Sequence, residues 1–500
     1  MIGRSMTEGA PWKHILRFAM PVLAGSLLQQ LYNTADSIIV GQFSGQSALS
    51  AVGTTNSFVF LFLAIAMGFS AGNGIIVAQH YGAGDEKQVR RDASTGIIML
   101  MIMGAVSAVV GFIAAYPAFK YLVAVPDELL DLTLQYFQIY AFGLIFQFGY
   151  NIFSSILRAV GDSAATLYFL LISSVLNIGL DLLFVAVFDW GVAGAAAATD
   201  IAQAASFVAA YIYMVKKYPI FRFKLKEYVW DKKSAVKTLT VGSPIALQLV
   251  IVSFGFTFIQ RAVNEFGENM TASFTVGSRI EMYLNLPCNA FQTTLATYAG
   301  QNIGAGKTER AKKGVHAGQL SAVIVALAVG SLLYLLCEYI MKAFGADGQV
   351  LMMGISGIRF LAFCYAFVGL DQVTGGAMRG AGAAIVPAIT AITSNLVRIP
   401  LAYFLGARPL RREIAQILSE KGPDLTEKAA ELFAGGAYST MEEAEQSAAA
   451  ILAAPNHFMY MFYAMGISMF IGALLIFLYF KFGNWHNKSV VKREVTEDNN

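Results

Sequence analysis

Charged residues are scarce in this sequence. Only 13% of its 500 residues are Asp, Glu, Lys or Arg, and 56% are hydrophobic. An average soluble domain contains about 25% charged residues, which cover much of its surface. The shortage of charge therefore excludes a soluble globular protein and predicts a chain that crosses a membrane several times.

Cysteine and histidine are also scarce. The three cysteines, Cys288, Cys337 and Cys364, are an odd number and form no Cys-x-x-Cys motif, which excludes a disulfide framework. The five histidines do not cluster, and we find no activated Ser or Cys and no paired His/Asp motif. We therefore expect a protein that is not an enzyme, with no bound cofactor and no nucleic-acid partner.

Long apolar segments dominate what is present. A helix that crosses the hydrocarbon core needs about 20 mostly apolar residues, and these segments are too long and too uniform to be barrel strands. The candidate spans are roughly 15–42, 51–78, 93–116, 133–157, 164–188, 191–215, 239–263, 273–300, 314–337, 355–378, 383–406 and 458–480. The sequence predicts an all-α integral membrane protein with twelve transmembrane helices.

The distribution of basic residues predicts the orientation. An even number of spans places both termini on one side of the membrane, and most Lys and Arg residues lie in the segments on that side. The short loops on the other side, such as "VPDELLD" and "NEFGEN", are acidic. By the positive-inside rule, both termini are cytoplasmic and the protein lies in the cell (inner or plasma) membrane.

The chain contains an internal repeat. "AQHYGAGDEKQVRR" from Ala78 resembles "GQNIGAGKTERAKK" from Gly300, an offset of 300 − 78 = 222, and "LRAVGD" resembles "MRGAGA" at nearly the same offset. A repeat of six spans predicts two six-helix lobes related by a pseudo-twofold axis along the membrane normal. The expected units are an N-lobe at 1–215, a cytoplasmic linker at 216–238, a C-lobe at 239–480 and a cytoplasmic tail at 481–500.

Several motifs carry a family resemblance. "MTEGAPWKHILRFAMPVLAGSLLQQLYNTADSIIVGQFSGQSALSAVG", "ILRAVGDS", "SRIEMYLNLPCNAF" and "AMRGAGA" resemble bacterial MATE (multidrug and toxic compound extrusion) transporters, in the family's order. The resemblance covers roughly 6–406 and 458–485. It implies alternating access of two lobes and export of organic, cationic compounds, coupled to inward Na⁺ or H⁺. We expect a monomer in the lipid bilayer with a small organic substrate.

Polar residues inside the spans are candidates for the coupling site. Asp36, Asp181 and Thr199 lie at a common depth, about 8–12 Å below the outer face at 1.5 Å of rise per residue, and Asn177 is one turn from Asp181. Carboxylates with neutral oxygens suit a hard cation or a proton. The resemblance implies that these four residues form the N-lobe cation site, which would hold Na⁺ if Na⁺ is the coupling ion. The alternative is a polar cluster that holds the helices together.

The second half does not copy this arrangement. The repeat partner of Asn177 is Arg398, at an offset of 398 − 177 = 221, and a cation argues against a second site of the same kind. We expect Arg398 to pair with Glu281 or Asp371, and these carboxylates are also candidates for contacting a cationic substrate. Asp200 points about 100° away from Thr199 around its helix and has no assigned role.

An insertion at 407–457 departs from the resemblance. It holds five basic and eight acidic residues, a net charge of 5 − 8 = −3, on the outer side. Capping boxes and stop signals predict two short helices here, and the signal residues are Asp424, Glu427, Gly435, Thr440, Glu443 and Pro455. The insertion is either a tolerated surface segment or an extracytoplasmic cap or docking point for a partner.

Two other functions fit a polytopic chain. One is a flippase for lipid-linked oligosaccharides of the same superfamily, and the other is a membrane receptor or scaffold that uses the insertion at 407–457. Neither more than twelve spans nor a strongly cationic cleft is evident, which weighs against the flippase. Cation-driven efflux in membrane vesicles separates a transporter from these alternatives.

Overall fold

The computed structural model describes residues 5–264, 268–434 and 440–491. Within these ranges the chain forms helices and no strand, so the predicted all-α class is confirmed. The helices are α1 (Pro11–Phe43), α2 (Gly45–Ala83), α3 (Glu86–Pro117), α4 (Asp127–Ala159), α5 (Ser163–Asp181), α6 (Gly191–Lys217), α7 (Lys232–Asn264), α8 (Glu268–Gly304), α9 (Thr308–Ala343), α10 (Gly348–Gly380), α11 (Ile385–Leu401), α12 (Arg408–Glu420), α13 (Pro423–Ala434) and α14 (Met441–Phe482).

Ten helices in the described ranges are long and apolar enough to cross a membrane. They make this a multi-pass membrane protein. Helices α1 and α8 are long enough to cross as well but are not among these ten. The predicted number of twelve spans therefore stays a prediction.

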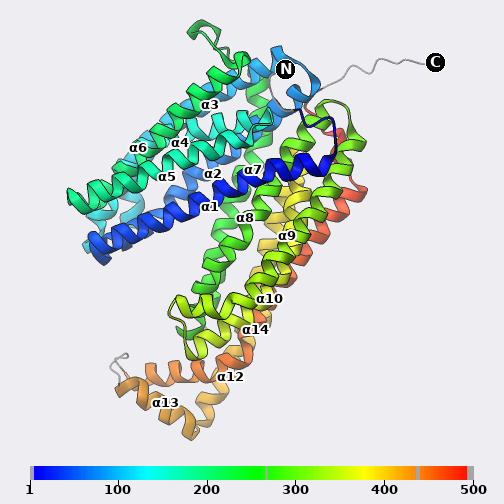
Figure 1. Ribbon diagram of the computed structural model, residues 1–500. Helices are drawn as coiled ribbons and strands as arrows, with labels where there is room; N and C mark the ends of the chain where they lie inside the picture. The colour runs from blue at the N-terminus through cyan, green and yellow to red at the C-terminus, as the bar shows by residue number, and fades with distance from the viewer. Residues whose placement is uncertain (1–4, 265–267, 435–439, 492–500) are drawn as a thin grey trace.

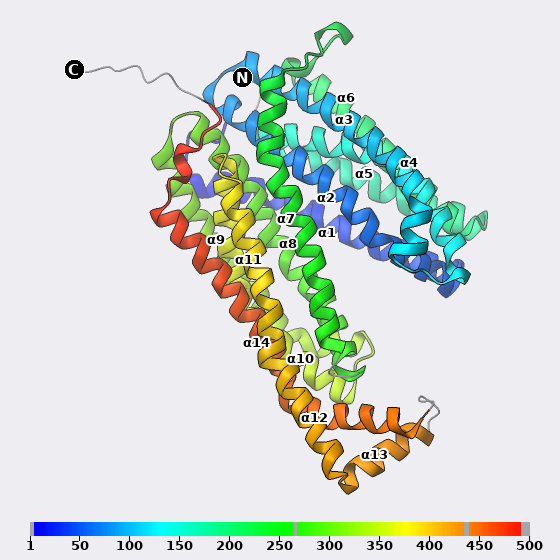
Figure 2. The same ribbon diagram turned by 180° about the vertical axis from the view of Figure 1, so that it is seen from behind.

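The long helices form two bundles (Figure 1, Figure 2). Helices α1–α6 make one bundle, which we call the N-lobe, and α7–α14 make the other, the C-lobe. The lobes meet at the end that carries both chain termini, here called the termini face, and diverge toward the opposite end, the far face. The molecule is therefore V-shaped and open at the far face.

Tight turns at the termini face follow from the two related Gly-rich motifs. Gly84 ends α2 with φ of +77°, and Gly306 follows α8 with φ of +73°, a region that favours glycine. After Gly84, the Asp85 side chain accepts a hydrogen bond of 2.9 Å from the backbone N–H of Gln88 and caps α3. The two related motifs therefore form equivalent tight turns.

Two glutamines join the lobes at the termini face. Gln79 Nε2 of α2 donates to the carbonyl of Gly380 at 2.7 Å, and Gln301 Nε2 of α8 donates to the carbonyl of Ala159 at 2.8 Å. The donors are 301 − 79 = 222 positions apart, and the acceptors are 380 − 159 = 221 positions apart. These two contacts between the lobes therefore follow the internal repeat.

The two chain termini bind the same glutamines. The backbone N–H of Met6 donates to Gln301 Oε1 at 2.8 Å, and the backbone N–H of Val490 donates to Gln79 Oε1 at 2.7 Å. Each amide thus bonds the other lobe through its nitrogen and a terminal segment through its oxygen. The termini face is closed by this paired set of hydrogen bonds.

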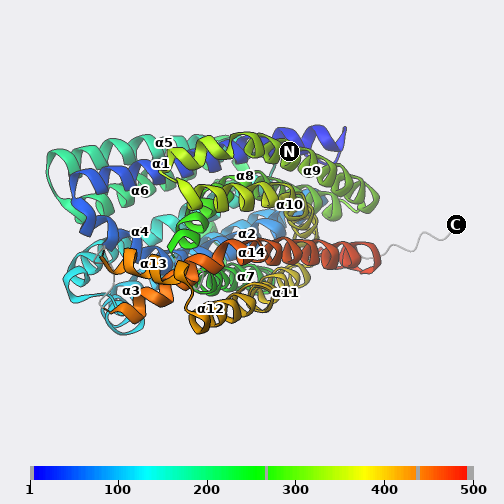
Figure 3. The ribbon, with the colours of Figure 1, turned by 90° about the horizontal axis from the view of Figure 1, so that it is seen from below.

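The insertion forms a three-helix cap made of α12, α13 and the first part of α14. Its own apolar core is built from Leu425, Ala429, Ala448 and Ala449, with partly buried residues such as Ile417 packed around it. The cap projects from the far end of the C-lobe toward the side on which the N-lobe lies (Figure 1, Figure 3).

The predicted starts and ends of the cap helices are partly wrong. The capping box of Thr440 and Glu443 is confirmed at the start of α14. Asp424 does not cap α13, because that helix already begins at Pro423. Pro455 does not end its helix, since α14 runs on to Phe482, and packing on both sides outweighs the one backbone hydrogen bond that proline lacks. The predicted stop at residue 435 lies outside the described residues.

Candidate functional site

The candidate site begins with two carboxyl groups that face each other. Helices α1 and α5 pack together, and they bring the side chains of Asp36 and Asp181 within hydrogen-bonding reach. Asp181 is fully buried, with 0% of its surface exposed. One oxygen of Asp36 and both of Asp181 are buried without a hydrogen-bond donor among the described residues. Two ionised carboxylates cannot bond each other, so the pair needs a proton or a cation between them.

Neutral oxygens complete the site. Asn177 lies one turn before Asp181 on α5 and is 1% exposed, and its Nδ2 donates to Thr199 Oγ1 of α6 at 3.5 Å. The Thr199 hydroxyl in turn donates to the carbonyl of Ala195 at 3.0 Å, which leaves its lone pairs toward Asn177. Asn177 Oδ1 has no donor within the described part of the chain. The structure therefore brings the four residues of the predicted N-lobe site together.

This donor set is that of a hard cation. The described residues contain no group of three or more His, Cys, Asp or Glu side chains suited to a metal. Any cation here relies on two carboxylates, an amide oxygen and a hydroxyl, which are ligands for alkali or alkaline-earth ions rather than for zinc. A single proton shared by the two carboxyl groups would bridge one oxygen of each and remove the repulsion between them.

A π-helical segment follows the site. Helix α5 ends at Asp181 and continues as η2 (Leu182–Val187), and α11 continues in the same way as η5 (Ala402–Ala407). π-Helical turns are frequent at functional sites. The repeat partner of Asp181 is Ala402, at an offset of 402 − 181 = 221. The C-lobe thus keeps the backbone geometry and lacks the carboxylate.

Tyrosines that the sequence pattern does not identify lie close to the carboxylates. Tyr32 lies one turn before Asp36 on α1 and is close enough to interact electrostatically with both carboxylates. Tyr136 and Tyr140 of α4 stack with ring centroids 6.2 Å apart and an interplanar angle of 15°, and Tyr136 lies within the same range of Asp36. The only sequence signal for them is the i, i+4 spacing of Tyr32 with Asp36.

Asp200 also lies close to Tyr136 and Tyr140. A Cβ added to Gly143 of α4 would lie 1.8 Å from Asp200 Oδ1, so the carboxylate occupies the space that the glycine leaves. Asp200 is close to Tyr136 and Tyr140, whereas Thr199 contacts Asn177. Asp200 and Asp36 therefore share Tyr136 as a neighbour.

The C-lobe candidates fall into two separate groups. Glu281 of α8 accepts a hydrogen bond of 2.7 Å from the hydroxyl of Tyr365 and lies in electrostatic range of Arg398. Arg398 Nε donates to Ser468 Oγ at 2.8 Å. These four side chains are buried, with 9% of Glu281 and 6% of Arg398 exposed.

Asp371 belongs to the second group. The cation within its range is Arg379 of the same helix, and Arg379 Nη2 donates to Gln248 Oε1 of α7 at 2.7 Å. Asp371 Oδ1 is buried and has no donor among the residues that the structure describes. Of the two carboxylates considered as partners of Arg398, the structure places Glu281 near it and Asp371 near another arginine.

Comparison with known sequences decides the family. The sequence profile of the MatE family matches residues 21–183 and 244–404, which are more than half of the chain. The chain belongs to the MatE family. The two matched segments start 244 − 21 = 223 positions apart, in agreement with the internal repeat, and the cap lies outside both.

Relatives of this MatE protein are named as probable multidrug resistance proteins. It is 28% identical over 403 residues to the "Probable multidrug resistance protein YpnP" of Bacillus subtilis, covering 80% of this chain and 90% of that one. It is 25% identical to the "Probable multidrug resistance protein NorM" of Thermotoga maritima, over 79% of this chain and 85% of that one. The MatE protein is therefore a member of a family of multidrug efflux transporters.

Solved structures share the fold of this MatE protein. One is described as the outward-facing conformation of a multidrug resistance MATE family transporter, with a TM-score of 0.80, 22% identity and coverage of 95% of this chain and 96% of that chain. A transporter of the MOP superfamily from Pyrococcus furiosus has a TM-score of 0.79 at 22% identity, with the same coverage. At this identity the likeness shows the fold alone.

Proposed function

We propose that this MatE protein is a cation-coupled antiporter that exports organic, cationic compounds in exchange for Na⁺ or H⁺. The observation that carries the proposal is the set of buried oxygens without donors on Asp36, Asn177 and Asp181. An apolar membrane interior does not tolerate such a set unless a cation or a proton occupies it part of the time. Reversible occupation is what coupling to an ion gradient requires.

The shape of the molecule supports alternating access. The lobes are in contact at the termini face and apart at the far face (Figure 2), as expected for one of the two end states of a transporter built from repeats. Basic residues concentrate at the termini face, in the segment from 216 to 237 above all, which favours a cytoplasmic location for that face in the cell membrane. With this orientation the V is open to the outside.

The decisive experiment is transport by reconstituted protein. Asp36→Asn and Asp181→Asn keep the shape of each side chain and remove its charge, and we expect either to abolish export driven by a Na⁺ or H⁺ gradient. Asp127→Asn, at an exposed position on the far face, is the matched control and should transport like the wild type. Gradient-driven export at the wild-type rate in Asp36→Asn, at equal protein level, contradicts the proposal.

The same vesicles identify the ion. Export that a Na⁺ ionophore abolishes and a protonophore leaves intact assigns Na⁺, and the reverse result assigns H⁺. If neither the Na⁺ ionophore nor the protonophore affects export, the proposed coupling to Na⁺ or H⁺ is wrong. The membership of the MatE family would not be affected.

A further inference from the structure

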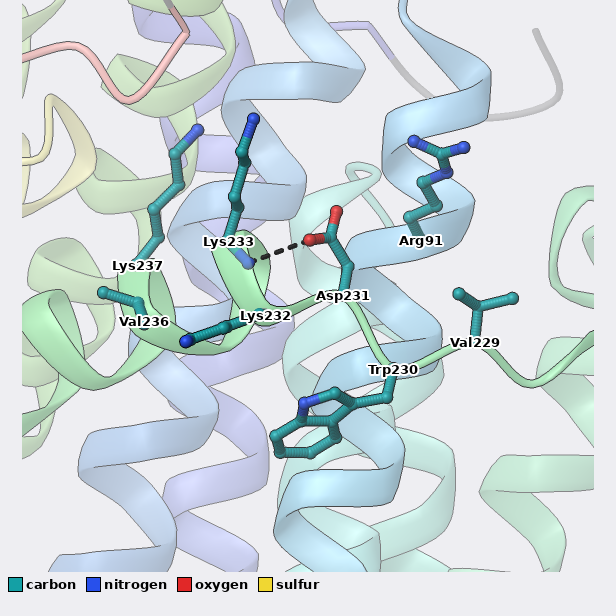
Figure 4. A pocket seen from close by; sticks show the side chains of 8 residues that line it. All are labelled: Arg91, Val229, Trp230, Asp231, Lys232, Lys233, Val236 and Lys237. Carbon is teal, nitrogen blue, oxygen red and sulfur yellow. Dashed lines mark hydrogen bonds between the residues drawn. The ribbon is translucent and has the colours of Figure 1, made fainter.

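A basic groove lies at the termini face, away from the candidate coupling site. It has a volume of about 760 Å³ and is lined by Arg91, Val229, Trp230, Asp231, Lys232, Lys233, Val236 and Lys237 (Figure 4). Four cations and one carboxylate give the lining a net charge of 4 − 1 = +3. Its chemistry is therefore that of an anion-binding surface.

The groove has a fixed backbone. Both backbone groups of Val229 are bonded to hydroxyls of α3, since its N–H donates to Ser94 Oγ at 2.8 Å and its carbonyl accepts from Ser94 Oγ at 3.1 Å. The N–H of Asp231 donates to Thr95 Oγ1 at 3.0 Å. The segment from 229 to 231 is thus held against α3 and positions Trp230 between α3 and α7.

The acid in the groove is already bonded. Asp231 Oδ1 accepts a hydrogen bond of 2.8 Å from the backbone N–H of Lys233. Burial raises the pKa of Asp231, but hydrogen bonds from the backbone of Lys233 and from Gln88 lower it more, and its net pKa lies below the ordinary value. Within the described ranges, Arg91, Lys232 and Lys233 make no ion pair. Lys232 and Lys233 are therefore available to an added anion, and Arg91 lies in electrostatic range of Asp231.

The side chains are arranged as at a membrane interface. Figure 4 shows the charged ends of Arg91, Lys233 and Lys237 pointing toward the termini face, with the Trp230 ring on the opposite side of the segment. The Trp230 side chain is 51% exposed. Tryptophan is enriched at the depth of the lipid headgroups, with basic residues beyond it on the aqueous side.

An apolar stripe continues from the groove along α7. Its members are exposed by 44% to 62% and recur at helical spacing on one face, namely Val236, Leu239, Leu247, Phe254 and Phe258. The stripe starts in the groove itself, at Val236. A ligand that fits both parts has an anionic head and apolar chains.

We propose that the groove binds an anionic phospholipid of the leaflet on the termini side, with its phosphate near Arg91 and Lys233 and its acyl chains along the α7 stripe. Clusters of Lys and Arg next to a membrane span attract anionic lipids by about 1 kcal/mol per residue. Because α3 belongs to the N-lobe and α7 to the C-lobe, the bound lipid contacts both lobes and holds the termini face closed.

Fluorescence of Trp230 tests the proposal on the purified full-length protein. Brominated phosphatidylglycerol in mixed micelles should quench the Trp230 signal at lower concentration than brominated phosphatidylcholine. The contribution of Trp230, one of four tryptophans, is the difference between the protein and Trp230→Phe. The same phosphatidylglycerol should raise the melting temperature.

Two triple variants, each of which removes three positive charges, distinguish binding in the groove from general electrostatic attraction of the lipid to the termini face. Arg91→Gln/Lys232→Gln/Lys233→Gln should weaken phosphatidylglycerol binding at least about tenfold, from about 1 kcal/mol per basic residue. Lys216→Gln/Lys226→Gln/Lys313→Gln removes three exposed cations of the same face outside the groove and should bind like the wild type. The single variant Lys233→Gln provides the same test if the triple variant fails to fold.

Three results would overturn the proposal. Equal quenching by phosphatidylglycerol and phosphatidylcholine would show that Trp230 contacts only the general lipid around the membrane spans and that the groove does not select an anionic lipid. Equal loss of binding in both triple variants would show attraction to the whole face. Protection of Trp230 by soluble polyglutamate at concentrations that displace phosphatidylglycerol would assign the groove to an acidic protein partner instead.

Discussion

The contacts of Thr199 indicate whether its hydroxyl binds the coupling ion or only forms a hydrogen bond between helices. Its hydroxyl proton is directed to the carbonyl of Ala195, and Asn177 Nδ2 approaches its oxygen at 3.5 Å, a long hydrogen bond. A cation between Asn177, Asp181 and Thr199 would replace this weak contact with stronger ones. The hydroxyl oxygen is therefore expected to bind the ion directly.

We predict that Thr199→Val lowers the apparent affinity for the coupling ion at least about tenfold, because an interaction with a charged group contributes about 1.5–3 kcal/mol. Thr199→Ser keeps the oxygen and should stay close to the wild type. The measurement is ion-dependent transport in proteoliposomes as a function of ion concentration. Equal affinities in the valine and serine variants would show that the hydroxyl does not bind the ion.

The residues of the site differ in how far the sequence identifies them. Asp36 and Asp181 are visible because a carboxylate inside an apolar span is rare, and helical rise places them at one depth. Tyr32, Tyr136 and Tyr140 are not visible, because the chain has 22 tyrosines and 37 phenylalanines, and most of them pack between helices or face lipid. Only the folded structure distinguishes these three, because it brings them close to the buried carboxylates.

At the scale of elements, Asp162 joins α5 to α6 at the termini face. Its Oδ1 accepts from the backbone N–H of Ala165 at 3.2 Å and caps α5. Its Oδ2 accepts from Lys217 Nζ at 2.8 Å and from the hydroxyls of Tyr213 and Tyr218 at 2.9 and 2.7 Å. One buried carboxylate thus fixes the start of one helix against the end of the next.

We predict that Asp162→Ala lowers the free energy of unfolding by about 2–4 kcal/mol, the sum of a lost N-cap and lost hydrogen bonds to a charged group. Asp162→Asn should cost less, because the amide oxygen still caps α5. Chemical or thermal unfolding of the detergent-solubilised protein measures both. If Asp162→Asn destabilises the protein as much as Asp162→Ala, the charge of Asp162 stabilises the fold and the N-cap hydrogen bond does not.

The lowered pKa of Asp162 predicts that the stability of the protein depends on pH. Burial raises the pKa of Asp162, but hydrogen bonds from Lys217, Tyr218 and Tyr213 lower it more, so its net pKa lies below the ordinary value of 3.8. A lowered pKa contributes stability that is present above pH 3.8 and is lost as the pH falls through the pKa of the folded state. At pH values below 3.8, the melting temperature of the wild type should therefore decrease more steeply than that of Asp162→Asn. If the melting temperatures of both proteins change with pH in parallel, Asp162 does not cause the dependence.

Helix ends were harder to predict than helix existence. The Thr440 capping box is local chemistry and identifies the start of α14, but Pro455 suggests a stop that tertiary packing overrides. The π-helical segments η2 and η5 have no local signal, although they occupy equivalent places in the two halves. Their position depends on how α5 and α11 pack, which hydropathy does not encode.

At the scale of the whole molecule, the repeat predicts two lobes but not the angle between them. Apolar spans specify which segments lie in the membrane, whereas the V shape depends on the contacts between the lobes. These include the hydrogen bonds of Gln79 and Gln301 with the opposite lobe and the apolar packing of α1 and α2 against α7 and α8. The two glutamine bonds are the part of this interface that follows the internal repeat. Because each lobe supplies one donor and one acceptor, both bonds have to break together when the termini face opens.

A reversible cross-link tests this motion. A Cβ added to Gly300 of α8 would lie 3.2 Å from the Cβ of Ala78 of α2, and a disulfide needs Cβ atoms about 3.5–4.5 Å apart. We predict that Ala78→Cys/Gly300→Cys forms a disulfide across the lobes, and that oxidation lowers transport at least about tenfold while reduction restores it. Cys288, Cys337 and Cys364 are buried and do not compete, and the two single variants control for the substitutions. Undiminished transport by the oxidised double variant would show that the lobes need not separate at the termini face, because a covalent bond there cannot be broken by the transport cycle.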